Sequence, residues 1–239
     1  MSNIKEAFPE YEKPSVAIDS VILRTGISTY KECDKHIAKR NLQILLVRKK
    51  GEELWHLPGT ILRLGETPRT AISRVVDDSN LYMEQLYTMA DNPMRDERGH
   101  IISIVYIGIA TGDVGVQSDI ESAWFDIIKP VDTCERLFKR VDNTEYSTFL
   151  PIDKLMYDHK DTIEDTLTRI KNKLMYSDIG FKFIEKEFTL TELENTFVAI
   201  NERAIPGFRR LISNKVEGTG KMISGKSFRP AEIYKKKVN

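Results

Sequence analysis

The sequence predicts an α+β protein in two parts, a strand-rich N-terminal part and a helical C-terminal part. Apolar runs typical of strands occupy most of the first 150 residues, around one short helix. After Pro151, apolar residues recur at helical spacing, and two glycine-punctuated extended stretches close the chain. With 239 residues, the chain is long enough to build two hydrophobic cores.

Four strands and one helix are predicted in the first part. The strands cover 15–23 (SVAIDSVIL), 42–47 (LQILLV), 101–110 (IISIVYIGIA) and 123–128. Thr67 can cap a helix over 67–78, because Pro68 suits the first helical position and apolar residues follow at helical spacing. The polar stretch 24–40 is expected to form a long loop. These elements suggest a sandwich of strands and helices.

The second part has the order helix, helix, basic helix, hairpin. The first helix carries an apolar face that includes Ile163 and Leu174, and Thr189 with Glu192 forms a capping box that opens the second. A short basic segment, 205–214, follows, and glycines then punctuate two extended stretches that end at Tyr234. This order predicts a winged helix-turn-helix, and we place the domains at 12–152 and 153–239.

The charge is unevenly distributed although the net charge is zero. From residue 205 to the end, nine Lys and Arg face two acids, so residues 1–204 carry an excess of acids. A basic region of this kind predicts an anionic partner, and a solubilising tail is the alternative. No apolar run reaches the roughly 20 residues of a membrane span, and the N-terminus has no signal-peptide core. We therefore expect a cytoplasmic protein without a membrane partner, whose two cysteines (Cys33 and Cys134) are free thiols.

Residues 59–81 (GTILRLGETPRTAISRVVDDSNL) resemble a degenerate Nudix box. Glu66 and Arg74 match the pattern, but Val75 replaces a Glu, and Asp78 and Ser79 stand at the paired Glu positions. Nudix hydrolysis needs several carboxylates that hold Mg²⁺ against a diphosphate, which a valine cannot do. Asp77 and Asp78 leave only a residual acidic spot. We expect no catalysis, no cofactor and no metal, with Glu66 and Asp78 as weak candidate ligands.

An ordered set of motifs is similar to the Nudix-related transcriptional regulators along nearly the whole chain. The motifs are RDERG (95–99), YDH (157–159), FTLTEL (188–193) and FRR (208–210). The resemblance implies a Nudix-fold α/β/α sandwich joined to a winged helix. It also implies a homodimer that binds a palindromic double-stranded operator and responds to a small molecule, such as an ADP-ribose-like nucleotide or a pentose sugar. The segment before the Arg pair departs from the family's usual Arg-Asn, since Pro206 and Gly207 stand there.

The basic C-terminal segment supplies the candidate DNA-binding residues. Arg209 and Arg210 open the short helix, where they could reach phosphates or guanine edges. The wing residues would contact the DNA backbone. Thr189 and Thr191 could bind phosphate at a helix N-terminus or serve only to cap it. The predicted DNA-binding set is Thr189, Thr191, Arg209, Arg210, Lys215, Lys221, Lys226 and Arg229.

The candidate ligand-binding residues of the first part are Trp55, Arg95, Asp96 and Arg98. Arg95 could hold an anionic group of a ligand or could pair with Asp96. Trp55 could stack on a ligand or belong to the core. None of the four histidines has metal-ligand spacing to another His or Cys, so we predict no zinc.

The sequence as a whole predicts a metabolite-responsive transcriptional regulator. The alternative is a Mg²⁺-dependent Nudix hydrolase that acts on ADP-ribose or another nucleoside diphosphate, with Glu66 and Asp78 as its metal ligands. A third hypothesis is a protein-binding adaptor without a nucleic-acid role.

Overall fold

The computed structural model describes residues 12–32, 35–77, 79–129, 136–141, 149–151, 155, 158–223 and 230–238. These divide into two compact units, 1–23 with 44–166 and 24–43 with 167–239. Asp78, Lys226, Arg229 and both cysteines lie outside the described residues, so the predictions made for them stay predictions. The predicted boundary after residue 152 stays a prediction as well, because residues 152–154 lie outside them too.

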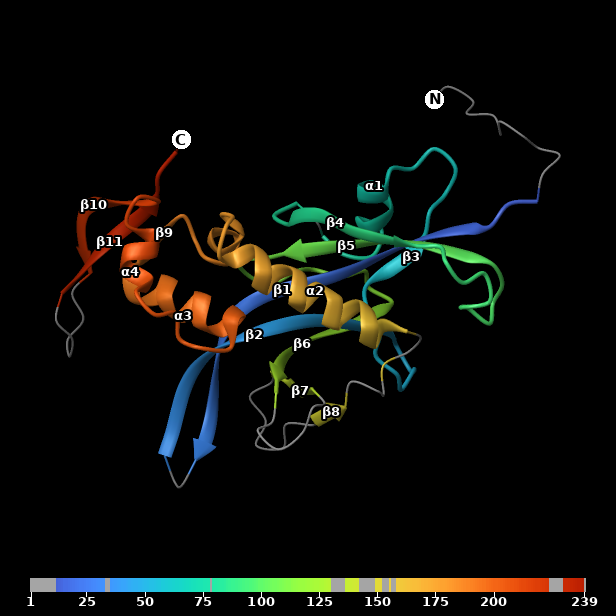
Figure 1. Cartoon of the computed structure of the whole chain (residues 1–239). Helices are drawn as coiled ribbons and strands as arrows, with labels where there is room; N and C mark the ends of the chain where they lie inside the picture. The colour runs from blue at the N-terminus through green and yellow to red at the C-terminus, as the bar shows by residue number, and fades with distance from the viewer. Residues whose placement is uncertain are drawn as a thin grey trace. The chain divides into compact units, whose positions relative to one another are not determined.

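The N-terminal unit is built on a mixed sheet with the strand order β4-β5-β1-β2-β6-β7-β8, and β3 pairs with β1 (Figure 1). Residues 24–32 of β1 and 35–43 of β2 belong to the C-terminal unit. The centre of the sheet is the parallel pair of β1 (Ser15–Glu32) and β5 (Ile101–Ile109), in which Ser15 lies opposite Ile101. Parallel strands are buried on both faces, which explains the near-continuous apolar sequence of β5. The other strands are β2 (Lys35–Lys49), β3 (Gly59–Ile61), β4 (Tyr82–Met89), β6 (Ile120–Ile128), β7 (Leu137–Arg140) and β8 (Phe149–Pro151).

The predicted helix over 67–78 is shorter than expected. Helix α1 covers only Pro68–Ile72, with Thr67 as its cap as predicted. Beyond it, Val75 and Val76 are both buried in the core, and Val76 forms a bridge with Val116. Residues 73–75 form a turn, in which the Val75 and Val76 N–H groups donate to the Ile72 carbonyl at 2.8 and 3.0 Å. Adjacent β-branched residues have a lower helix propensity, which favours the end of the helix here.

The predicted long loop over 24–40 is wrong, because β1 and β2 run through most of this stretch as strands. The polar composition misled the prediction, because residues 37–39 are exposed and a strand face in solvent carries polar residues. Within the C-terminal unit, the Thr25 hydroxyl donates to the carbonyl of Phe183 at 3.2 Å. Arg24 Nε donates to Gln43 Oε1 across the ribbon at 2.7 Å.

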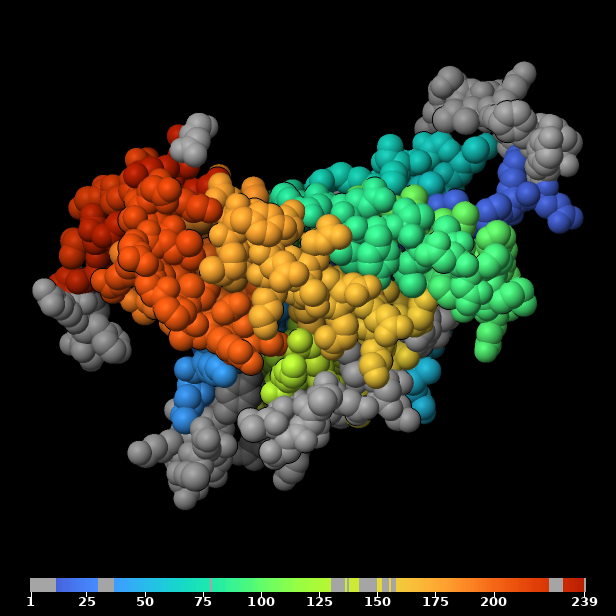
Figure 2. Space-filling view, viewed as in Figure 1, coloured from blue at the N-terminus to red at the C-terminus, as the bar shows by residue number. Residues whose placement is uncertain are grey.

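The C-terminal unit has the predicted order of elements. The second half of α2 (His159–Leu174) and a 3₁₀ turn, η2 (Ile179–Phe183), lead into β9 (Glu187–Thr189). Helices α3 (Leu190–Asn201) and α4 (Phe208–Ile212) then precede the wing strands β10 (Val216–Ile223) and β11 (Ala231–Lys236). The three strands pair in the order β10-β11-β9. The surface of α3, α4 and the wing is orange to red in Figure 2.

Aromatic rings form the core of this unit. Phe197 packs edge-to-face against Phe181 and Phe208, with ring centroids 6.1 and 5.1 Å apart. Gly180 is required beside them, because a Cβ there would lie 2.5 Å from the Phe197 ring. Edge-to-face pairs of this kind stabilise a core by about 0.5–1.5 kcal/mol each beyond their burial. This core seats α3 and α4 as the two helices of a helix-turn-helix.

Candidate functional site

A cavity of about 220 Å³ opens in the N-terminal unit, where the ends of several strands meet the first residue of α2. Both charged and apolar side chains reach it. Its walls come from β1, β3, the 95–98 segment before β5, and the start of α2. The lining residues are Ala17, Asp19, Lys49, Glu52, His56, Leu57, Gly59, Thr60, Ile61, Arg95, Asp96, Arg98, Ser103, Asp158 and His159. Three of the four predicted ligand-binding residues are among them.

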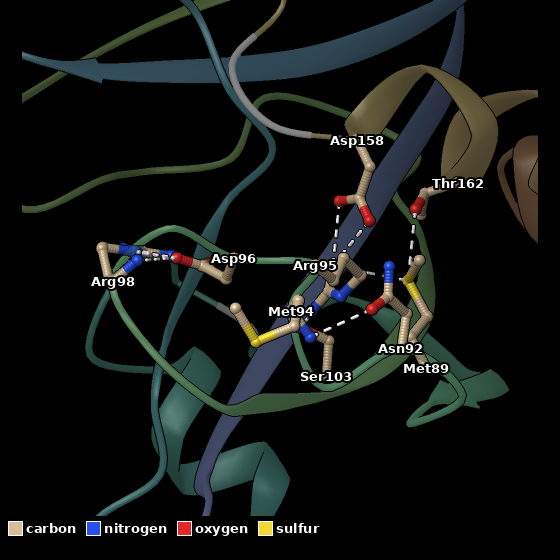
Figure 3. Close-up of polar contacts among 9 residues, drawn as sticks. All are labelled: Met89, Asn92, Met94, Arg95, Asp96, Arg98, Ser103, Asp158 and Thr162. Carbon is tan, nitrogen blue, oxygen red and sulfur yellow. Dashed lines mark hydrogen bonds and ion pairs between the residues drawn. The ribbon is translucent and has the colours of Figure 1, made fainter.

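Arg95 is held by partners on both sides. Its Nη1 donates to both carboxylate oxygens of Asp158, at 2.9 and 2.8 Å, and its Nη2 donates to the Ser103 hydroxyl at 2.6 Å (Figure 3). The sequence offered Asp96 as the alternative partner of Arg95, but the ion-pair partner in the structure is Asp158, 63 residues away. The guanidinium therefore faces the cavity already carrying a carboxylate.

Asp96 pairs instead with Arg98. The Arg98 side chain donates to both Asp96 oxygens, at 2.9 and 2.6 Å, and the Arg98 backbone N–H donates as well, at 2.9 Å. These bonds lower the pKa of the Asp96 carboxyl to about 2. The pair fixes the turn before β5 and leaves the Arg98 side chain largely exposed at the rim of the cavity.

Asp19 is a half-buried carboxyl that lines the cavity and that the sequence prediction did not single out. Burial raises its pKa above the ordinary value, whereas the Ser103 hydrogen bond and the Arg95 charge lower it. Gly59 is needed opposite it, since a Cβ there would lie 2.3 Å from an Asp19 oxygen. One signal was present in the sequence, namely a charged residue inside an otherwise apolar strand.

His159, the first residue of α2, is buried and neutral. Its Nδ1 accepts the backbone N–H of Leu57 at 3.1 Å, so the proton of the neutral ring is on Nε2. Burial, together with the neighbouring His56, lowers the pKa of the His159 imidazole to about 4. At neutral pH the ring can thus act as a hydrogen-bonding group of fixed direction but carries no charge.

The degenerate box does not gather a metal site in the described residues. Glu66 forms an ion pair with Arg74, with Glu66 Oε1 2.8 Å from Arg74 Nε, and accepts the Arg63 backbone N–H at 2.9 Å. Asp77 is exposed and accepts the Ser79 backbone N–H at 3.0 Å. Among the residues that the structure describes, no group of three His, Cys, Asp or Glu side chains could hold a metal ion. Glu66 therefore works as a partner of Arg74 here.

Trp55 lies apart from the cavity. It is 6% exposed and packs edge-to-face on Phe125, with ring centroids 5.2 Å apart. The Arg48 guanidinium lies 4.5 Å from its ring centroid. The structure thus places Trp55 in the core rather than among the cavity residues.

In the winged helix, the predicted cations fall into two groups. Lys215 is paired with Asp178 at 3.0 Å and Lys221 with Glu187 at 2.7 Å. Arg209 and Arg210 are exposed on α4, and neither forms an ion pair with any described residue. Of the predicted cations that the structure describes, these two arginines are the ones without an ion pair.

Thr189 has a structural role at the start of α3. Its hydroxyl accepts the Glu192 backbone N–H at 3.2 Å, and Glu192 in turn accepts the Thr189 backbone N–H at 2.8 Å. This is the predicted capping box, and Thr189 is only 9% exposed. Thr191, next to it, is exposed.

The comparisons with known proteins identify the C-terminal winged helix separately from the rest of the chain. Residues 180–235 match the model of the NrtR DNA-binding winged helix domain. An "ADPR responsive transcriptional repressor NtrR" from Acinetobacter baylyi is 24% identical over 246 residues, which cover 95% of this chain and 83% of that protein. No helix among the described residues is long and apolar enough to cross a membrane.

Two solved structures share the fold along nearly the whole chain. The MutT/nudix family protein from Enterococcus faecalis has a TM-score of 0.68 at 22% identity, covering 97% of this chain and 90% of that one. Shewanella oneidensis NrtR complexed with a 27mer DNA has a TM-score of 0.60 at 21% identity and covers 93% of each chain. The predicted fold, a Nudix-like unit with a C-terminal winged helix, is confirmed. The match to a DNA-binding winged helix and to a transcriptional repressor supports a regulator.

Proposed function

We propose that this chain is a cytoplasmic transcriptional regulator whose DNA affinity changes when a small metabolite occupies the cavity. Its fold and its winged helix are those of a Nudix-related regulator. ADP-ribose is the first effector to test, because the A. baylyi relative is named as responsive to it. The observation that carries the proposal is the winged helix matched over 180–235, with Arg209 and Arg210 exposed on α4 and in no ion pair with a described residue.

A homodimer on a palindromic operator is part of the proposal. One helix-turn-helix reads only a few base pairs, and two copies related by a two-fold axis read two half-sites. The α4 arginines of each copy would contact phosphates or guanine edges, and the β10–β11 wing would contact the DNA backbone.

The Nudix-like unit would then act as a sensor without catalysis. Glu66, the best match to a metal ligand, is engaged by Arg74 and by the Arg63 backbone N–H. The cavity instead presents arginines, carboxylates and a neutral histidine, which suit a hydroxylated anionic metabolite.

The test is a selection of genomic fragments by the full chain at physiological salt, compared with the double variant Arg209→Ala, Arg210→Ala. The wild type should enrich a few fragments that share an inverted repeat, and the double variant should bind them at least about tenfold more weakly. A matched control removes two cations from α2, Arg169→Ala and Lys173→Ala, and should leave the enrichment unchanged. Equal binding by the α4 double variant would exclude α4 as the recognition helix.

The hydrolase alternative is tested by incubation with ADP-ribose and Mg²⁺ or Mn²⁺. The proposal expects no turnover. Turnover that Glu66→Gln abolishes would establish an enzyme in place of a sensor.

A further inference from the structure

The charges on the cavity wall determine how an anion can enter it. This inference rests on the proposed function and deepens it. The cavity wall holds three cationic side chains and four carboxylates. Two of the cations, Arg95 and Arg98, already carry a carboxylate each. The cations are Lys49, Arg95 and Arg98, and the carboxylates are Asp19, Glu52, Asp96 and Asp158. An anionic effector therefore meets a wall without surplus positive charge.

The two arginine pairs differ in how their partners are attached. Asp96 and Arg98 belong to one turn and are two residues apart, so their pair is local. Asp158 reaches Arg95 from a segment 63 residues away, directly before α2. Separation of the second pair therefore frees Arg95 from a remote segment of the chain, whereas Asp96 stays beside Arg98 in the same turn.

Arg95 is also the better anchored of the two arginines. Ser103, which is 2% exposed, accepts from its Nη2 at 2.6 Å, and the same hydroxyl donates to Asp19. If Asp158 withdrew, Ser103 would still hold the guanidinium at the cavity wall. The Nη1 group that now donates to both Asp158 oxygens would then be free to donate to the oxygens of a phosphate or of another carboxylate.

We propose that Asp158 is a built-in competitor that occupies the anion position of Arg95, so that an effector must carry a phosphate or carboxylate that displaces it. The Asp158 side chain is 27% exposed, which leaves water access for the exchange. The effector's anion replaces the Asp158 carboxylate on Arg95, and the carboxylate turns to solvent. No covalent bond changes.

The displacement alters the start of α2. Arg95–Asp158 joins the β4–β5 region to the start of α2 (Figure 3). Further along the helix, the Thr162 hydroxyl contacts the Met89 sulfur at 3.8 Å, and the Tyr87 side chain forms hydrogen bonds with Thr162 and Asp165. Helix α2 continues without a break to Leu174, and its second half belongs to the C-terminal unit. Breaking the Arg95–Asp158 pair on effector binding gives the sensor two states that differ at the first turn of this helix.

The experiment is a calorimetric titration of the full chain with ADP-ribose and, separately, with inorganic pyrophosphate. While the Asp158 carboxylate occupies Arg95, only the remaining fraction of molecules can bind an anion there, which lowers the apparent affinity. Asp158→Asn should therefore bind either anion about tenfold more tightly than wild type. Asn has nearly the same shape as Asp, and thermal unfolding checks that the variant is folded.

Two further variants separate displacement from a general change of charge. Glu52→Gln removes a carboxylate from the same cavity wall without freeing an arginine, so it should raise the affinity for either anion by much less than Asp158→Asn does. In an Arg95→Ala background, Asp158→Asn should give no gain, because the position for which it competes is lost. A gain by Glu52→Gln equal to that of Asp158→Asn would overturn the displacement model.

The remaining outcomes distinguish this inference from the proposed function. If wild type binds ADP-ribose and Asp158→Asn binds it equally or more weakly, the competitor role is wrong while the sensor role stands. If Asp158→Asn gains affinity for pyrophosphate only, the competitor role is supported and ADP-ribose is wrong as the effector. If neither protein binds either anion, both are wrong.

Discussion

Removing the Thr189 hydroxyl gives the sharpest test of whether this residue caps α3 or binds phosphate. In Thr189→Ala, the Glu192 backbone N–H loses the acceptor that now lies 3.2 Å away. Loss of a capping side chain costs about 1 kcal/mol, within a range of roughly 0.5–2. For Thr189→Ala we expect a loss of about 1 kcal/mol or more, because Thr189 is only 9% exposed and water cannot readily replace the hydroxyl.

The assay is hydrogen exchange of the full chain, resolved by peptide. A loss of about 1 kcal/mol speeds the opening of α3 about fivefold, so amides of Leu190–Asn201 should exchange faster by that factor. Both tryptophans, Trp55 and Trp124, belong to the N-terminal unit, and their fluorescence should report unchanged unfolding there. The control is Thr191→Ala, an exposed neighbour with the same chemical change, for which we expect less than about 0.5 kcal/mol.

Unchanged exchange in α3, combined with weaker and less salt-dependent DNA binding by Thr189→Ala, would refute the capping argument. That result would assign the hydroxyl to a phosphate contact instead.

Three other predictions concern packing and the cavity. Gly180→Ala should destabilise the C-terminal unit by about 1–3 kcal/mol in urea unfolding, because its Cβ would lie 2.5 Å from the Phe197 ring; a stability equal to wild type would contradict the packing described. The pKa of His159 is lowered to about 4, so it contributes stability above the unfolded pKa of about 6.5 that is lost as the pH falls towards 4. His159→Asn should flatten stability between these pH values, and an unchanged slope would count against a buried neutral ring. Gly59→Ala should displace the Asp19 carboxylate and weaken ADP-ribose binding in calorimetry, whereas wild-type affinity would place the effector elsewhere.

The helices and strands that were predicted correctly are those that neighbouring residues in the sequence specify. The apolar run of β5 and the capping box of α3 each specify an element through neighbouring residues alone. The ribbon over 24–40 was missed because a strand with polar faces lacks the alternation that prediction relies on. The strand β4 was missed for the same reason, since polar and apolar residues mix along it.

The cavity could be predicted only in part. Arg95, Asp96 and Arg98 stand together in one motif, and the structure places all three at the cavity wall. The partner of Arg95 could not be deduced, because Asp158 is remote in sequence and nothing local distinguishes it from other acids. Asp19 is a similar case, since its raised pKa comes from burial that only the folded sheet provides.

In the proposed mechanism, occupation of the cavity controls DNA binding by the winged helix. This control is measured as the affinity of the full chain for its most enriched genomic fragment, followed by fluorescence anisotropy as ADP-ribose is added. Saturating ADP-ribose should change this affinity by about tenfold or more, and Arg95→Ala should not respond. An affinity that stays constant while calorimetry shows ADP-ribose bound to the cavity would contradict it.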